Sequence, residues 1–141
     1  MNTNKILLGT IVGGIAYFLL GWIIYGMMMQ GFMTSHYNQC MMKPETDFTW
    51  WALIISNFAW SLLYAVIISW GNMASVAGGA KVGLVAGALI MLSFDLSFYS
   101  MSTMYDSFST LIIDVVVGTI LSAIGGAVIG WVMGRGKTAA A

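Results

Sequence analysis

Four long runs of apolar residues alternate with short polar links along this chain. The runs cover Ile6–Met29, Trp50–Trp70, Ala80–Met104 and Phe108–Gly134. Each run exceeds about 18 residues, the length from which an apolar helix can cross a hydrocarbon core about 30 Å thick. The pattern therefore predicts an all-α fold, a four-helix transmembrane bundle that forms a single domain over residues 1–137.

The composition excludes an ordinary soluble domain. Of the 141 residues, 60% are hydrophobic and 7% are charged, whereas soluble domains carry about 25% charged residues. A soluble surface built from this chain would expose large apolar patches and aggregate, so the lipid bilayer is the predicted partner of most of the surface. The first run lacks a small-residue cleavage site and is too long for a signal peptide, which predicts that it remains as a membrane helix. Residues Thr138–Ala141 are predicted to be a disordered tail or a remnant of cloning.

The basic residues predict the orientation in the membrane. With four spans, one side of the bundle carries most of them: Lys5, Lys81, Arg135 and Lys137. The opposite side carries Lys43 alone. Because positively charged loops stay in the cytoplasm, both the N and the C terminus are predicted to be cytoplasmic. The segment Gln30–Thr49 and the tight link near Tyr105–Asp106 would then face outward.

Small residues recur every four positions in the last two runs. They are Gly79, Gly83 and Gly87, followed by Gly118, Ser122, Gly126, Gly130 and Gly134. Such a pattern lets two membrane helices approach closely, either within one chain or in a homo-oligomer formed through these two glycine-rich helices. The small residues concentrate toward the predicted cytoplasmic half, whereas aromatic residues fill the outer half. This distribution predicts a bundle that splays outward around a cavity.

Two acidic residues interrupt the apolar runs at matching depth. Asp95 precedes the last link and Asp114 follows it, so at about 1.5 Å per helical residue both lie about 10–15 Å below the outer end of the hairpin. We expect the two carboxyl groups to be level on neighbouring helices. Residues predicted at the same depth, or within reach of the carboxyls, are Asn57 on the second run, Trp22 and Tyr25 on the first, and Ser93 or Ser97 beside Asp95.

The chemistry of this pair suggests a function. An ionised carboxylate in hydrocarbon costs about 2.5–3.5 kcal/mol. No basic residue lies near either aspartate in the runs, since Lys81 stands at the very start of the third one. Desolvation and mutual repulsion favour the neutral form, and a shared proton or a bound cation would resolve the conflict. We therefore predict an outward-facing polar site that binds or conducts a proton, a cation or a small solute. Its predicted residues are Asp95, Asp114, Asn57, Tyr25, Trp22 and Ser97. The alternative is a structural or assembly subunit in which the carboxyls only join helices.

A second candidate site lies in the outer segment, where methionines are frequent. Its candidate ligands are Met29, Met33, His36 and Cys40. Thioether, thiolate and imidazole groups suit Cu(I), which makes copper handling another alternative. Methionine is also a flexible filler of uneven apolar packing. No cofactor other than copper is suggested by the sequence.

The chain carries none of the common enzyme signatures. It lacks a G-x-S-x-G elbow, a P-loop and an H-E-x-x-H pair, and no basic patch supports nucleic-acid binding. We therefore expect a non-enzymatic protein without a nucleic-acid partner.

Two segments suggest a relationship to other proteins. GGIAYFLLGWIIYG (Gly13–Gly26) and DVVVGTILSAIGGAVIGWVMG (Asp114–Gly134) resemble small bacterial four-helix integral membrane proteins of an uncharacterised family, a domain of unknown function. The resemblance implies a multi-pass protein of the bacterial cytoplasmic (inner) membrane. It supplies no activity, cofactor or site residue.

Overall fold

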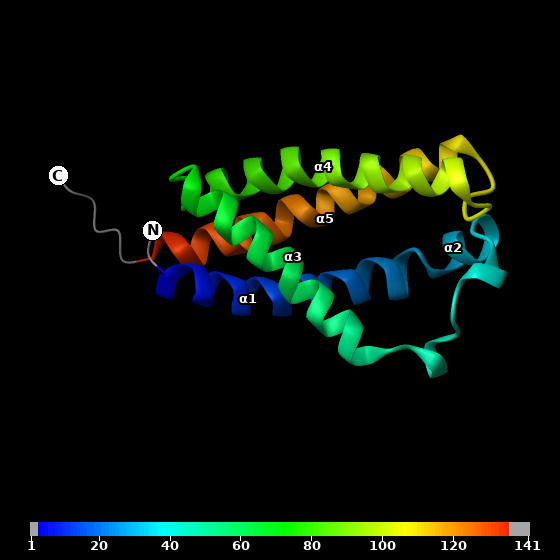
Figure 1. Cartoon of the computed structure of the whole chain (residues 1–141), viewed down its shortest axis with the longest axis horizontal. Coiled ribbons are helices and arrows are strands. Elements are labelled where there is room, and N and C mark those ends of the chain that lie inside the picture. The colour runs from blue at the N-terminus through cyan, green and yellow to red at the C-terminus, as the bar shows by residue number, and fades with distance from the viewer. Residues whose placement is uncertain (1–2, 136–141) are drawn as a thin grey trace.

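A computed structural model describes residues 3–135 of the chain, and helices dominate it (Figure 1). Helix α1 covers Thr3–Gly21 and continues as a π-helix, η1, over Trp22–Met28. The other long helices are α3 (Trp50–Trp70), α4 (Val76–Met101) and α5 (Phe108–Gly134). All four long segments, α1 with η1 counted as one, have the length and hydropathy of membrane spans. The chain is therefore an all-α, multi-pass membrane protein, as its apolar pattern predicts.

Two of the helices differ from the predicted boundaries. Helix α4 begins at Val76 rather than Ala80 because Ser75 caps it, accepting a hydrogen bond from the Gly78 amide. It ends at Met101 rather than Met104 because the backbone becomes extended at Ser102. The first run is a continuous α-helix only to Gly21, after which η1 widens the turn. The predicted tail, residues 138–141, lies outside the described residues.

The close helix contacts predicted from the glycine pattern form within one chain. Helices α4 and α5 run side by side along their length, while α3 crosses α1 and α5 obliquely (Figure 1). A Cβ atom added at Gly79 would overlap the Gly126 carbonyl, and one added at Gly83 would overlap the Ser122 carbonyl. The small-residue faces of α4 and α5 therefore hold these two helices together. An oligomer formed through the same faces has no support in this structure.

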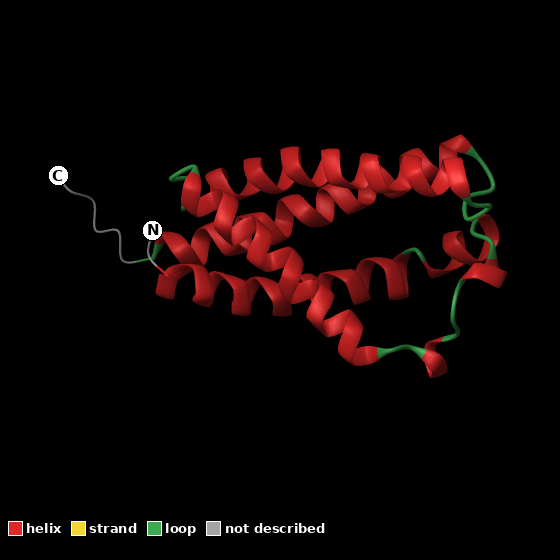
Figure 2. Cartoon of the chain, viewed as in Figure 1, coloured by secondary structure: helices red, strands yellow, loops and turns green. Residues whose placement is uncertain are grey.

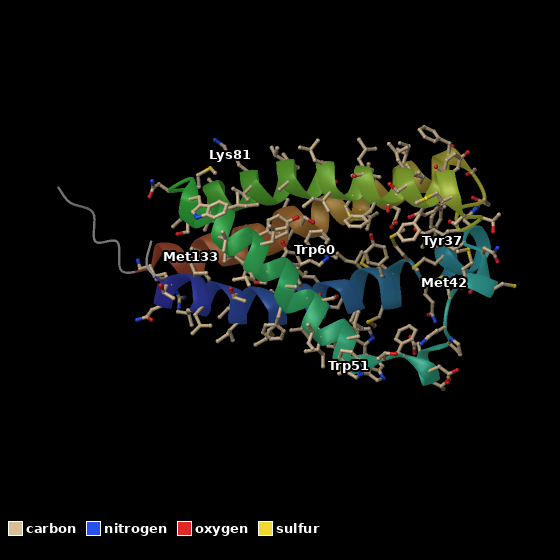
Figure 3. All side chains as sticks on the ribbon, viewed as in Figure 1. Tyr37, Met42, Trp51, Trp60, Lys81 and Met133 are labelled. Atoms are coloured by element: carbon tan, nitrogen blue, oxygen red, sulfur yellow. The ribbon has the colours of Figure 1, made fainter. Side chains whose placement is uncertain are left out.

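The two ends of the bundle differ in chemistry. We call the end where α1 begins and α5 ends the terminal end; there Lys5 Nζ donates a hydrogen bond to the Arg135 carbonyl at 3.0 Å. Lys81 lies toward the same end (Figure 3). The grouping of these basic residues agrees with the sequence pattern. Which side of the membrane this end faces stays a prediction, and Lys137 lies outside the described residues.

The opposite end carries the α4–α5 link, and we call it the hairpin end. It is also covered by the connection between α1 and α3, in which short helices alternate with loops (Figure 2). These short helices are α2 (Gln30–His36), η2 (Gln39–Met41) and η3 (Glu45–Asp47). The long connection between η1 and α3 thus covers the hairpin end, whereas within residues 3–135 the opposite end carries the short link between α3 and α4.

The buried side chains form two clusters. The larger lies in the half toward the terminal end and consists of Ile6, Tyr17, Tyr64, Ala65, Ile68, Val82, Ile129 and Met133. The smaller lies at the hairpin end and consists of Tyr37, Tyr105 and Leu111; we call it the tyrosine cap. Large apolar side chains elsewhere are exposed, such as Leu7, Val85 and Ile120. Their exposure fits a surface in contact with lipid.

Candidate functional site

The two acidic residues of the apolar runs are buried and meet through a tyrosine. Asp95 on α4 is 5% exposed and Asp114 on α5 is 6% exposed. The hydroxyl oxygen of Tyr105 lies 3.0 Å from Asp95 Oδ1 and 3.0 Å from Asp114 Oδ2. The prediction that the carboxyls are level on neighbouring helices is confirmed.

Counting hydrogens at this bridge constrains its protonation. A tyrosine hydroxyl has one hydrogen to donate and accepts through its lone pairs. The hydrogen of Tyr105 is either shared between the two carboxyls or donated to one of them. In the second case a protonated carboxyl would donate to the tyrosine oxygen. A neutral acid at one position would also remove the repulsion between two buried carboxylates.

Tyr105 is held in place by the segment that follows α2. The Asn38 amide donates to the Met104 carbonyl at 2.9 Å, and the Asp106 amide donates to the His36 carbonyl at 3.1 Å. These bonds surround an antiparallel β-bridge between Tyr37 and Tyr105, whose rings meet edge to face at 5.2 Å. The tyrosine cap therefore covers the carboxyl pair at the α4–α5 link.

The electrostatics of the cap keep its tyrosines protonated. Burial raises the pKa of both the Tyr37 and the Tyr105 phenol well above its ordinary range, and the neighbouring Asp114 and Asp95 carboxylates raise it further. Both phenols therefore remain hydrogen-bond donors at any physiological pH. Beside them, hydrogen bonds from Thr110 and then His36 lower the pKa of Asp106. That exposed carboxylate stays ionised and ties α2 to the start of α5.

A cavity of about 860 Å³ adjoins the carboxyl pair. Its walls come from α1, η1, α3 and α5, with two residues of α4 and the connection between η1 and α3. Trp60 lies near the middle of the bundle and Tyr37 near the hairpin end (Figure 3). Asp114 lines this cavity, whereas Asp95 does not. The structure thus places one carboxyl of the pair in the cavity wall and the other behind it.

The remaining predicted site residues divide into two groups. Trp22, Tyr25 and Asn57 all line the cavity, and the Tyr25 phenol interacts with Asp114. Asn57 does not reach the carboxyls, because its amide donates to the Leu53 carbonyl of its own helix at 2.8 Å. Ser97 is not brought to the site at all, contrary to the prediction. It lies on the exposed face of α4, and its hydroxyl donates to the Ser93 carbonyl at 2.8 Å.

The sequence reasoning missed the tyrosines of the cap. For Tyr105 a signal existed: it lies in a tight link, ten residues after Asp95 and nine before Asp114. A large side chain in so short a link can fold back over the helix ends and reach both acids. Tyr37 gives no such signal, because it arrives from a distant connection through the β-bridge.

The candidate copper ligands are spread over the hairpin end. Met33 packs against the tyrosine cap, and His36 Nδ1 lies 2.7 Å from Asp106 Oδ2. Cys40 is a free, exposed thiol, and Met29 is partly buried before α2. Within residues 3–135, no group of three or more His, Cys, Asp or Glu side chains is placed to hold a metal ion. Copper binding through methionine thioethers stays a prediction.

Comparison with known proteins identifies no family. No family model matches the chain, and neither a curated protein nor a solved structure is significantly similar to it. The four long apolar helices are consistent with a small four-helix membrane protein.

Proposed function

We propose that this chain is a non-enzymatic membrane protein that binds or conducts a proton, a cation or a small solute at the Asp95–Tyr105–Asp114 bridge. The observation that supports the proposal is the single hydroxyl in contact with two buried carboxyls. A proton bound to one carboxyl, or a cation between the two, would stabilise this buried pair, and either could exchange with the surroundings. Acidic residues in such positions commonly mark proton relays or ion pathways.

The surroundings of the pair support exchange rather than a purely structural role. The tyrosine cap separates the carboxyls from the hairpin end, whereas Asp114 lines the cavity. One oxygen on each side, Asp95 Oδ2 and Asp114 Oδ1, has no hydrogen-bond partner although it is buried. Buried polar groups that only join helices are normally satisfied. The free oxygens leave room for a second proton or for a cation.

The bridge can be tested by replacing Tyr105 with phenylalanine. We expect the carbon-13 signals of both Asp95 and Asp114 to shift, because each carboxyl loses its hydrogen bond with Tyr105. Solid-state NMR of aspartate-labelled protein in lipid measures the two signals. The matched control is Tyr99→Phe, since Tyr99 is exposed and its ring packs on Phe108 instead. A shift of one carboxyl signal alone would show that Tyr105 does not join the pair.

The orientation forms part of the proposal. We place the terminal end, with Lys5, Lys81 and Arg135, in the cytoplasm of a bacterium and the hairpin end outside the inner membrane. The support is the excess of basic residues at the terminal end, which is typical of cytoplasmic loops. The cavity would then open toward the outside.

The single native cysteine provides a direct test of orientation. Cys40 lies in η2 at the hairpin end and is exposed. We expect a membrane-impermeant maleimide to label it in intact spheroplasts. In the matched control, Cys40→Ser combined with Lys81→Cys, labelling should require permeabilised membranes. The reverse pattern would place the termini on the outside.

A further inference from the structure

We propose that the cavity beside Asp114 binds an amphiphilic organic cation, a molecule with an apolar or aromatic body and a protonated amine. The amine would pair with the Asp114 carboxyl, and the body would fill the space between η1 and α3. This inference rests on the proposed function, because it requires that the carboxyl pair exchanges its proton or cation through the cavity.

The size and walls of the cavity fit such a molecule. Small-molecule sites usually measure about 300–1,000 Å³ and are lined mostly by apolar side chains with a few polar groups, and this cavity measures about 860 Å³. Besides Tyr17 and Tyr64, six aromatic residues contribute to the walls: Phe18, Trp22, Tyr25, Phe48, Trp50 and Trp60. The aromatic rings would contact a flat or branched apolar body.

One buried carboxyl oxygen at the cavity has no partner. Asp114 is 6% exposed, and its Oδ1 atom accepts no hydrogen bond. Buried side-chain polar atoms are satisfied in the large majority of cases. A hydrogen-bond donor or a cation in the cavity would supply the missing partner.

The charge of the walls favours a cation. Asp114 is the ionisable acid in the membrane-embedded wall, and the charged residues Lys43 and Glu45 at the rim carry opposite signs. Aromatic rings attract cations as well; Trp22 and Tyr25 belong to the cavity wall, and Tyr25 interacts with Asp114. An anion would meet the carboxyl pair, and a wholly apolar chain would leave Asp114 Oδ1 unpaired. A protonated amine satisfies both the charge and the missing donor.

The cavity also offers a route of entry. Its walls extend from Tyr64 and Ser122, deep in the bundle, to Gln39 and Lys43 in the connection at the hairpin end. A ligand that enters there meets the polar side chains of Gln39 and Lys43 together with the aromatic rings of Phe48 and Trp50. An amphiphile has groups that suit both kinds of surface.

The experiment compares two fluorescent probes that differ only in the amine. Dansylcadaverine carries a primary amine, and its N-acetyl derivative does not. Each is titrated into the full chain in phosphatidylcholine nanodiscs, and energy transfer from tryptophan to the dansyl group is measured, with empty nanodiscs subtracted. Since Trp22, Trp50 and Trp60 line the cavity, bound dansyl groups lie within transfer distance of all three. We expect the amine to bind at least tenfold more tightly than the acetylated probe.

Variants assign the preference to the carboxyl. Asp114→Asn should abolish the tenfold difference, whereas Asp47→Asn, which removes an exposed carboxylate outside the cavity, should retain it. Should Asp114→Asn fail to fold, displacement from the wild-type chain still decides: octylamine should displace the bound probe and octanol should not. Equal affinity of the two probes, or displacement by both alcohol and amine, would overturn the proposal.

The NMR and the probe experiments together separate the two proposals. If Tyr105→Phe shifts both carboxyl signals but the amine probe binds no more tightly than the acetylated one, the organic cation is refuted and the proton site stands. If the amine probe binds more tightly but Tyr105→Phe does not shift both signals, the shared bridge is refuted. In that case the cavity would bind cations through Asp114 alone.

Discussion

Liposomes that contain the Asp114→Asn variant are expected to take up protons no faster than liposomes without protein. Asparagine keeps the size and polarity of the side chain, but it cannot gain and lose a proton. Asp114 is the carboxyl of the pair that lines the cavity, so its loss removes the step between the cavity and the buried bridge. With a potassium-driven membrane potential and an internal pH dye, we expect a loss of tenfold or more relative to wild type.

The companion variants show whether the pair acts as a unit. Asp95→Asn should cause a similar loss, and the double variant should be no worse than either single one, because groups that share a proton do not contribute additively. Asp47→Asn serves as the control, since this exposed carboxylate lies in the connection at the hairpin end. Proton uptake at the wild-type rate in Asp114→Asn would rule out conduction through the pair. Slow uptake in wild type itself would restrict the site to binding.

Replacing Gly83 with alanine is expected to destabilise the bundle by about 2–3 kcal/mol, the upper part of the range for overpacked cores. The added methyl group would overlap the Ser122 carbonyl and contact the Ala123 backbone. Because these atoms belong to the backbone of α5, no side-chain rotation relieves the overlap. Helices α4 and α5 must separate along their shared face, and the positions of Asp95 and Asp114 would change with them.

Gly21→Ala is the matched control for this substitution. Gly21 ends α1, and a Cβ atom added there would meet nothing within 4 Å. Alanine favours helix over glycine by about 1 kcal/mol, so this variant should be as stable as wild type or slightly more stable. Unfolding by sodium dodecyl sulfate in mixed micelles measures both free energies. Equal stability of the two variants would show that α4 and α5 do not approach as closely as the structure has them.

The sequence predicted those features that depend on local pattern and helical geometry. Apolar length predicts α3 and α5 as the structure has them, and a rise of about 1.5 Å per residue brings Asp95 and Asp114 to one level. The four-residue spacing of glycines predicts the seam between α4 and α5, although not that it lies within one chain. These inferences succeed because each depends on neighbouring residues alone.

Features that depend on distant contacts could not be predicted in this way. Tyr37 reaches Tyr105 only because the connection after α2 forms a β-bridge with the α4–α5 link. The exposed position of Ser97 could have been predicted from the burial of Asp95. Residues two positions apart on a helix point about 200° away from each other around its axis, so Ser97 faces away from the buried side. The change to the π-helix η1 at Trp22 has no clear signal in the apolar run.

The most direct test of the central claim is infrared titration of the wild-type protein in lipid. The bridge predicts that a carboxylic acid C=O band persists at pH 7 and disappears in both Asp95→Asn and Asp114→Asn, because one proton belongs to the pair. Two carboxyl groups that ionise independently near pH 4, the ordinary value for aspartic acid, would contradict the shared proton and the function built on it.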